Sequence, residues 1–286
     1  MQPVSVHGGH TGEFCCHGRD TLEQVILKYI DLGFQWVGIT EHIFPPADSL
    51  RYPDEVAAGL DSRSLEDRFR RYMRTCRELQ HKYRDEIDIF AAFESETYTG
   101  YQDFIPWAIE EFKPDYIVGS VHHVDDICID YSRDGYLGAV RAAGGLEALY
   151  CRYFDIQHHM IESLSPAVVG HFDLIRIFDP HYHETIRIPE IWDRIIRNLK
   201  LIRTRDIIMD FNLRALMKGA GEPYISLPIL QEAASMKIKV VPGDDSHGTG
   251  DIGVNMARAM EILARVGITP PWPRPGTPNH FWKKPK

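Results

Sequence analysis

The chain has 286 residues, of which 44% are hydrophobic and 11% aromatic, and its formal net charge is −9. This length suffices for a large buried core and fits one large domain or two small ones. The negative charge disfavours nucleic acid and anionic membranes as partners, because both attract basic surfaces. It is compatible with a small anionic substrate, since a bound metal ion can reverse the charge locally.

The cysteines and the N-terminus indicate a cytoplasmic location. The five cysteines are scattered and form no Cys-x-x-Cys pair, which is typical of reduced thiols rather than of a disulfide framework. No charged segment followed by an apolar one opens the chain, so we expect no signal peptide. No apolar run approaches roughly 18 residues, so we expect no membrane span.

Short β-branched runs alternate with helical patterns along the chain. Strands are expected at residues 3–7, 35–40, 87–93, 116–118, 167–170, 206–211 and 239–242. Helices are expected at residues 21–32, 65–83, 104–112, 136–164 with an interruption near Gly144, 189–199, 227–236 and 252–266. Residues 43–62 contain prolines and are expected to be irregular. The Pro-rich tail 269–286 is expected either to pack one end of the fold or to be disordered.

About seven β-α repeats predict a parallel sheet. We interpret residues 1–286 as one α/β barrel rather than two domains, because candidate polar groups follow every strand. In such barrels the active site lies at the C-terminal ends of the strands, on one face. Polar side chains at the expected strand ends should therefore meet.

Side chains that bind metals gather at these strand ends or on the loop after the first strand: His7, His10, His17, His42, Glu94, His122, His171, Asp245 and His247. A single histidine there is more often a hydrogen-bonded loop residue than a ligand, but the joint pattern indicates a multinuclear metal site. Asp245 and His247 are two residues apart, so an extended chain points both the same way. Imidazole and carboxylate ligands without thiolate suit Zn, Mn or Fe.

The number of candidate ligands exceeds what one ion needs. We therefore expect two or three divalent ions, with Glu94 as the bridge between two of them. Such a site clamps a phosphate and lowers the pKa of bound water to make a nucleophile near pH 7. The Cys15-Cys16 pair has no metal-ligand spacing to another cysteine and is compatible with core packing.

Six motifs occur in one order along residues 4–256: SVHGGHTGEFCCHG, ITEH, AAFESE, GSVHH, GHFD and PGDDSH. Together they resemble the polymerase-and-histidinol-phosphatase (PHP) superfamily, and more closely its histidinol-phosphate phosphatase branch. The resemblance implies a distorted (β/α)7 barrel and a site of two or three metal ions. It also implies hydrolysis of a small phosphorylated metabolite, L-histidinol phosphate, to L-histidinol and phosphate in histidine biosynthesis.

The resemblance also implies roles for the ligands. Glu94 matches the bridging carboxylate of the first two metals, and Asp245 and His10 match ligands of the first. The second metal would be completed by His122 and His171, and the third would be held by His17, His42 and His247.

The first strand departs from the family pattern. The family has a His-x-His pair there, but this chain has Gly8 at the first position of the pair, and His7 lies one residue too early. Residues three apart in a strand face opposite sides, so His7 and His10 should not converge. Two adjacent glycines could rotate the chain and bring His7 back.

Cations and acids near the site complete the hypothesis, in which a metal-bridging hydroxide attacks phosphorus. Arg176 and Arg214 are candidates for binding phosphate, because arginine favours bidentate contacts with it; each could instead form a surface salt bridge. Asp173 and His123 are candidates for the acid that protonates the leaving alkoxide, and Glu96 is a candidate for binding the substrate amine or imidazole.

Two other functions are compatible with the sequence. The chain could be a PHP-type phosphoesterase for another phosphomonoester or a nucleotide. It could also be a non-catalytic protein that binds metal or phosphate and has lost its first metal, because Gly8 replaces a ligand. The sequence leaves the identity of the metal and the oligomeric state open.

Overall fold

The computed structural model describes residues 2–276, and its main sheet has seven strands that are all parallel. Their order is β1 (Val4–Gly8), β2 (Trp36–His42), β3 (Asp88–Ser95), β4 (Ile117–Gly119), β7 (Val168–Val169), β8 (Ile208–Asn212) and β9 (Lys239–Gly243). The first and last strands approach each other, because the Asp245 amide donates a hydrogen bond of 2.8 Å to the His7 carbonyl. The predicted (β/α)7 barrel is confirmed, as a nearly closed one.

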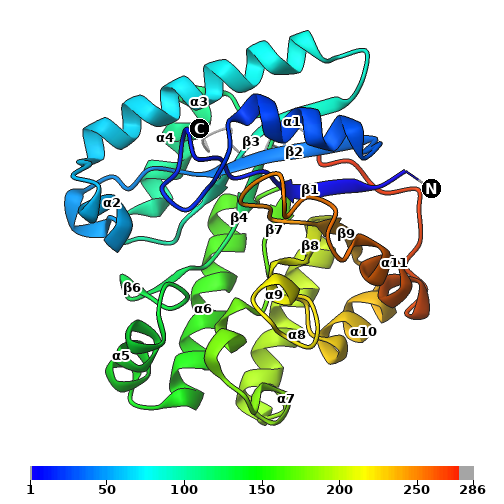
Figure 1. The fold of residues 1–286 in the computed structure, drawn as a ribbon. Helices are drawn as coiled ribbons and strands as arrows, with labels where there is room; N and C mark the ends of the chain where they lie inside the picture. The colour runs from blue at the N-terminus through cyan, green and yellow to red at the C-terminus, as the bar shows by residue number, and fades with distance from the viewer. Residues whose placement is uncertain (1, 277–286) are drawn as a thin grey trace, which may run out of the picture.

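Helices surround these strands, with α1, α3 and α4 on one side and α6, α8 and α10 on the other (Figure 1). The longer helices are α1 (Leu22–Asp31), α3 (Ser62–Lys82), α4 (Tyr101–Phe112), α5 (Arg133–Ala143), α6 (Leu146–Leu164), α8 (Pro189–Thr204), α10 (Leu227–Ser235) and α11 (Met256–Arg265). Thr21 begins α1 with a capping box to Gln24, and Asp61 caps α3 by accepting from the Ser64 amide. The predicted break at Gly144 is confirmed, since this glycine ends α5 with a φ of 89°.

Several local predictions were wrong. Residues 43–62 are not wholly irregular, because they contain the short helices η1 (Asp48–Leu50) and α2 (Pro53–Ala57). Helix α11 begins at Met256, four residues after the predicted start, since Asn255 before it has a left-handed φ of 66°. The sequence reading also missed the antiparallel hairpin of β5 (His123–Val124) and β6 (Ile127–Cys128), and the short helices η2 (Leu174–Phe178), α7 (Tyr182–Thr185) and α9 (Arg214–Met217).

A cluster of buried apolar side chains from the barrel strands and from Tyr116 lies inside the barrel: Val4, Val6, Trp36, Ala92, Tyr116, Val118, Val168, Ile208 and Val241. Trp272 packs against this cluster, and Arg274 forms a 2.6 Å ion pair with Asp88 at the start of β3. The part of the tail up to residue 276 thus packs one end of the barrel, while residues 277–286 lie outside the described residues. Among residues 2–276, none of the helices combines the length and apolar character that crossing a bilayer requires.

Candidate active site

The alternation of side chains along the strands places a layer of polar side chains next to the apolar cluster. This polar layer consists of the predicted metal ligands His7, His10, His17, His42, Glu94, His122, His171, Asp245 and His247. Trp36 on β2 and Ala92 on β3 belong to the cluster in the barrel interior. Successive side chains of a strand face opposite sides, so His42 and Glu94, at even spacing from these residues, face the interior as well. The polar layer therefore lies at the C-terminal ends of the strands, as expected.

Strand β1 reaches this layer through a one-residue bulge. Ser5 pairs with Val37, but Gly8 pairs with Ile39, so β1 holds one residue more than β2 between these pairs. The bulge turns His7 to the interior, where its Nε2 lies 3.4 Å from Oε2 of Glu94. Position 8 has no room for a side chain, because a Cβ there would lie 2.7 Å from the hydroxyl of Tyr29 on α1. The bulge thus presents His7 to the interior and leaves position 8 facing Tyr29.

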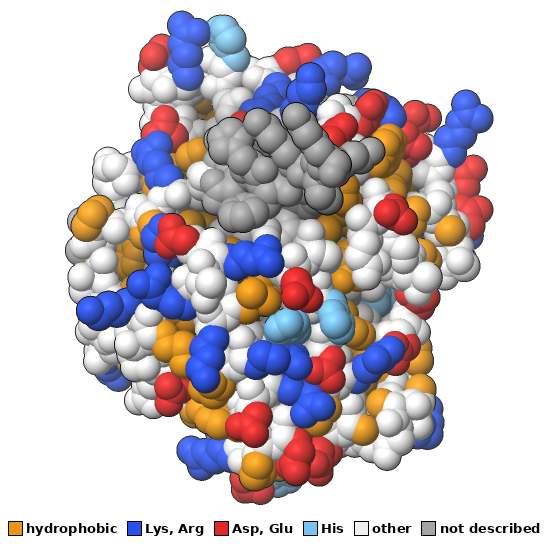
Figure 2. All heavy atoms as spheres, turned by 180° about the vertical axis from the view of Figure 1, so that it is seen from behind, with side chains coloured by type: hydrophobic (Ala, Val, Ile, Leu, Met, Phe, Trp, Pro, Cys, Tyr) orange, Lys and Arg blue, Asp and Glu red, His pale blue; other side chains and the backbone are white. Residues whose placement is uncertain are grey.

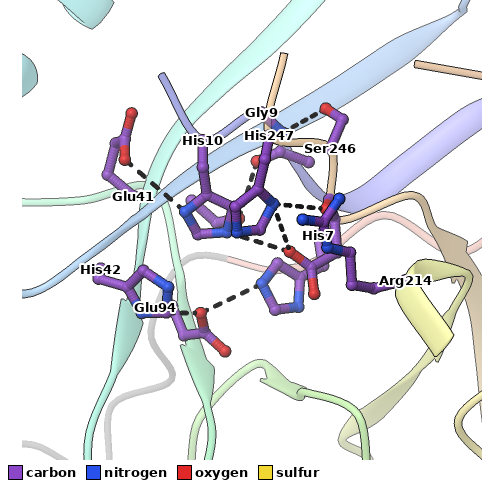
Figure 3. A network of polar contacts seen from close by, with 12 residues as sticks. His7, Gly9, His10, Glu41, His42, Glu94, Arg214, Ser246 and His247 are labelled. Carbon is purple, nitrogen blue, oxygen red and sulfur yellow. Dashed lines mark hydrogen bonds and ion pairs between the residues drawn. The ribbon is translucent and has the colours of Figure 1, made fainter. Parts of the chain in front are cut away.

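Glu94 is the centre of the polar layer. Its Oε1 lies 2.8 Å from Nε2 of His171 and 3.1 Å from Nε2 of His122, and its Oε2 lies 3.2 Å from Nδ1 of His42. Figure 3 shows His7 and His42 approaching this carboxylate from different strands. Burial alone would raise the pKa of Glu94, but the surrounding histidines, His7 first, hold it well below its usual value. The Glu94 carboxylate is therefore ionised, as a bridge between two metal ions requires.

His10 and His247 form a second part of the layer. Nε2 of His10 lies 3.2 Å from Asp245, and its ring centroid lies 4.5 Å from that of His247 and 4.6 Å from that of His42. Burial alone would lower the pKa of His10, but Asp245 and Glu41 raise it to about 9. Burial and the charge on His10 lower the pKa of His247 well below its usual value.

The donor atoms of this layer fit divalent metal ions. Ligand atoms lie within 4.8 Å of one another in the groups His7-Glu94-His171, His7-His10-Asp245, His10-His42-His247 and His42-Glu96-His122. Nε2 of His7 and of His10 are buried and, among the described residues, make no well-directed hydrogen bond, although they lie 3.4 Å from Glu94 and 3.2 Å from Asp245. Buried polar atoms that lack a hydrogen bond are costly, and a metal ion between each nitrogen and its carboxylate would satisfy both. Imidazole and carboxylate donors suit Zn, Mn or Fe.

His17 lies at the edge of the layer. Its ring centroid is 5.4 Å from that of His42 and 6.3 Å from that of His247, and about a quarter (24%) of its side chain is exposed. The structure thus brings all nine predicted metal ligands to one end of the barrel.

Three carboxylates that were not predicted from the sequence contact the Nδ1 atoms of three of these histidines. Nδ1 of His7 lies 2.9 Å from Asp210, Nδ1 of His122 lies 3.2 Å from Asp130, and Nδ1 of His17 lies 2.6 Å from Asp54. Such carboxylate–histidine pairs orient metal ligands in proteins. Asp210 could have been found from its even spacing to Asn212 on β8, whereas Asp54 and Asp130 lie outside the predicted strands.

A cavity of about 250 Å³ opens above the layer, and Arg214 and Lys218 bring positive charge to its wall. Arg214 donates to Asp251 over 2.9 Å, and its buried Nε makes no hydrogen bond with the described residues. The remaining walls of the cavity include Tyr52, Tyr131, Leu174 and Tyr224. Arg214 is therefore the one predicted phosphate ligand that lines this cavity.

Asp173 and Arg176 are not among the residues that line the cavity. Arg176 contacts Asp173 over 3.2 Å, donates to the carbonyl oxygens of Glu222 and Pro223, and lies 4.6 Å from the ring centroid of Tyr224. These contacts direct the guanidinium to the loop that holds Tyr224. The roles of Arg176 in phosphate binding and of Asp173 as acid stay predictions that this geometry does not favour.

Glu96 and His123 also lie behind the cavity wall. Glu96 is fully buried, accepts a 2.9 Å hydrogen bond from the Tyr52 hydroxyl, and lies 3.1 Å from His42 and 3.3 Å from His123. Neither Glu96 nor His123 lines the cavity. Their contacts with substrate likewise remain predictions.

A model of the PHP domain matches residues 8–214 of the chain. The chain belongs to the PHP domain family. This confirms the resemblance seen in the six sequence motifs.

Two yeast proteins are similar to this PHP domain protein along most of its length. A Schizosaccharomyces pombe protein named "Probable histidinol-phosphatase" is 34% identical over 93% of this chain and 88% of its own. The histidinol-phosphatase of Saccharomyces cerevisiae is 28% identical over 91% of this chain and 88% of its own.

Two solved structures share the fold. A Listeria monocytogenes protein described as a candidate histidinol phosphatase has a TM-score of 0.79 and 28% identity, covering 89% of this chain and 99% of its own. The histidinol phosphate phosphatase of Lactococcus lactis, complexed with Zn, L-histidinol and phosphate, has a TM-score of 0.71 and 17% identity, covering 94% of each chain. The second comparison supports the fold alone.

Proposed function

We propose that this protein is a metal-dependent phosphomonoesterase that hydrolyses L-histidinol phosphate to L-histidinol and phosphate in histidine biosynthesis. The observation that carries the proposal is the convergence of histidines on the buried, ionised Glu94 beneath a cavity of small-molecule size. The relationship to the two yeast proteins, over most of each chain, supports the choice of substrate.

The polar layer would hold two or three divalent ions, and zinc is the first metal to test because it suits these donors and is bound by the Lactococcus lactis protein that shares this fold. Following the family resemblance, we assign three sites: His7, His10, Glu94 and Asp245; Glu94, His122 and His171; and His17, His42 and His247. The first is supported by the group His7-His10-Asp245, the second by the contacts of His122 and His171 with Oε1 of Glu94, and the third by the proximity of the His17 ring to the rings of His42 and His247. Bound there, the ions would neutralise phosphoryl oxygens and lower the pKa of water.

The residues of the cavity wall would position the substrate. Arg214 and Lys218, which line the cavity, would bind the phosphate oxygens that remain exposed. Asp130 and Asp54 place carboxylates on the wall that suit the substrate's ammonium group, and the ring of Tyr224 suits its imidazole. A wall with both charge signs matches a substrate that is anionic at one end and cationic at the other.

The surface supports a small molecule rather than nucleic acid as partner. On the face drawn in Figure 2, Lys and Arg side chains intermingle with Asp and Glu, so the described residues there form no broad basic surface. All five cysteines are free, which fits the reducing cytoplasm. We further propose that the chain is a single domain, since one sheet contains all seven barrel strands.

The proposal is tested by phosphate release from a panel of substrates. Chelator-treated protein is reloaded with Zn, Mn or Fe and assayed on L-histidinol phosphate, other phosphomonoesters and nucleotides. We expect kcat/KM to be highest for L-histidinol phosphate, and a Glu94→Gln control to be inactive on all substrates. A preference for another substrate would favour a different PHP-type phosphoesterase. No turnover of any substrate, with metal confirmed bound, would favour a binding protein.

A further inference from the structure

The bulge of β1 directs His7 to the centre of the site, and the backbone around it is held on three sides. The Val6 carbonyl accepts a 2.6 Å hydrogen bond from the Tyr116 hydroxyl. The His7 carbonyl accepts from the Asp245 amide over 2.8 Å, and the Gly8 carbonyl accepts from the Thr40 hydroxyl over 3.0 Å. A bulge disrupts the ladder locally, so these contacts replace part of the regular pairing.

Tyr116 reaches Val6 by crossing the interior of the barrel. It precedes β4, is fully buried, and belongs to the apolar cluster beneath the polar layer. Its path requires a glycine on β2, because a Cβ at Gly38 would lie 1.5 Å from the Tyr116 hydroxyl. Gly38 thus leaves room for Tyr116, and Tyr116 stabilises the bulge from the start of another strand of the barrel.

Asp210 determines which nitrogen of His7 faces Glu94. Its Oδ2 accepts a hydrogen bond from Nδ1 of His7 over 2.9 Å and another from the side-chain Nδ2 of Asn212 over 2.9 Å. The same Asn212 nitrogen donates to Asp245 over 3.0 Å. The proton of a neutral His7 therefore lies on Nδ1, which leaves the lone pair of Nε2 directed toward Glu94.

We propose that Tyr116 and Asp210 are positioning residues that make His7 a metal ligand in place of residue 8. Tyr116 fixes the backbone of the bulge, and Asp210 fixes the ring and its tautomer. The inference rests on the proposed metal centre and explains how this chain keeps a first-strand ligand although Gly8 occupies the family's usual position.

The test compares zinc binding by five purified proteins: wild type, Tyr116→Phe, Asp210→Asn, His7→Ala and Tyr72→Phe. Tyr72 is the matched control, because it is also fully buried and its hydroxyl also donates to strand carbonyls, but those of Ile39 and Ala92 on β2 and β3 rather than one on β1. Each protein is stripped of metal and titrated with zinc against a competing chelator, and bound zinc is counted by elemental analysis. The unfolding midpoint of each metal-free protein is recorded.

We expect His7→Ala to lose one zinc ion per chain. We expect Asp210→Asn to bind that ion roughly 10- to 100-fold more weakly, as is typical when an outer partner of a metal ligand is removed. We expect Tyr116→Phe to weaken the binding of the same ion, because the backbone that carries His7 loses its hydrogen bond at Val6. Tyr72→Phe should keep wild-type affinity for every ion even where its unfolding midpoint falls as far as that of Tyr116→Phe.

Wild-type zinc affinity in Tyr116→Phe would overturn the role of Tyr116, and equal weakening in Tyr72→Phe would reduce it to general stability. If Asp210→Asn does not fold, Tyr116→Phe still decides. A full complement of zinc in His7→Ala would overturn the inference as a whole. Failure of the wild type to hydrolyse L-histidinol phosphate would instead overturn the proposed function and leave these zinc measurements standing.

Discussion

Removing the metal ions should make the stability of this protein depend on pH through His10. In the metal-free chain, burial alone would lower the pKa of His10, but Asp245 and Glu41 raise it from 6.5 to about 9. Between these two pH values the folded chain holds a proton on His10 that the unfolded chain has released. The free energy of unfolding therefore falls as pH rises through this window, and the contribution is fully present only below pH 6.5.

The size of the effect follows from the pKa difference. A difference of about 2.5, at roughly 1.4 kcal/mol for each pKa unit, gives about 3 kcal/mol between pH 6.5 and 9. His7 and His122 act in the same direction, because nearby carboxylates raise the pKa of each against the effect of burial. Burial is the main cause that lowers the pKa values of His42 and His247. These two residues therefore reduce the free energy of unfolding only as pH falls below 6.5.

The assay is denaturant unfolding of chelator-treated protein at pH 6.5 and pH 9. We expect the wild type to lose about 3 kcal/mol more between the two conditions than a His10→Gln variant does. His81→Gln, an exposed position on α3, serves as the control and should behave like the wild type. Equal losses in the wild type and in His10→Gln would show that His10 does not hold this proton in the folded chain.

Three further predictions address other parts of the site. Glu94→Gln should lose bound metal, by elemental analysis, and reduce kcat more than about 100-fold, the upper range for outer partners of metal ligands. Arg214→Met should raise KM for L-histidinol phosphate roughly tenfold or more in steady-state kinetics, since hydrogen bonds to charged groups are worth about 1.5–3 kcal/mol; an unchanged KM would remove it from the phosphate site. Arg176→Met should lower the free energy of unfolding by about 3–5 kcal/mol, because it removes the cation that faces the buried Asp173 and leaves that carboxylate with the hydrogen bond from the Ser226 amide, while the number of bound zinc ions stays that of the wild type.

The barrel and the polar layer were predictable because they depend on local periodicity. Each strand is built on a short apolar run, and polar residues at or just past its end, such as Glu94 in β3 and His171 after β7, have a defined place at the C-terminal edge of the sheet. The break at Gly144 was predictable for a similar local reason. Glycine tolerates the left-handed conformation that ends a helix.

Features that depend on contacts between distant strands were not predictable. The placement of His7 depends on a bulge held by Tyr116 from the far side of the barrel, and nothing in the first strand specifies that contact. Arg176 had suitable chemistry for phosphate, but its direction is decided by Asp173 and by the loop around Tyr224. Asp130 follows the unpredicted β5–β6 hairpin, so its approach to His122 gave no sequence signal.

We propose that metal ions bound around Glu94 catalyse the hydrolysis of L-histidinol phosphate. Titrating metal-free protein with zinc while following phosphate release from this substrate tests this proposal. We expect a rate that reaches its plateau at two or three equivalents of zinc per chain. A plateau at one equivalent, or phosphate release that does not depend on zinc, Mn or Fe, would contradict it.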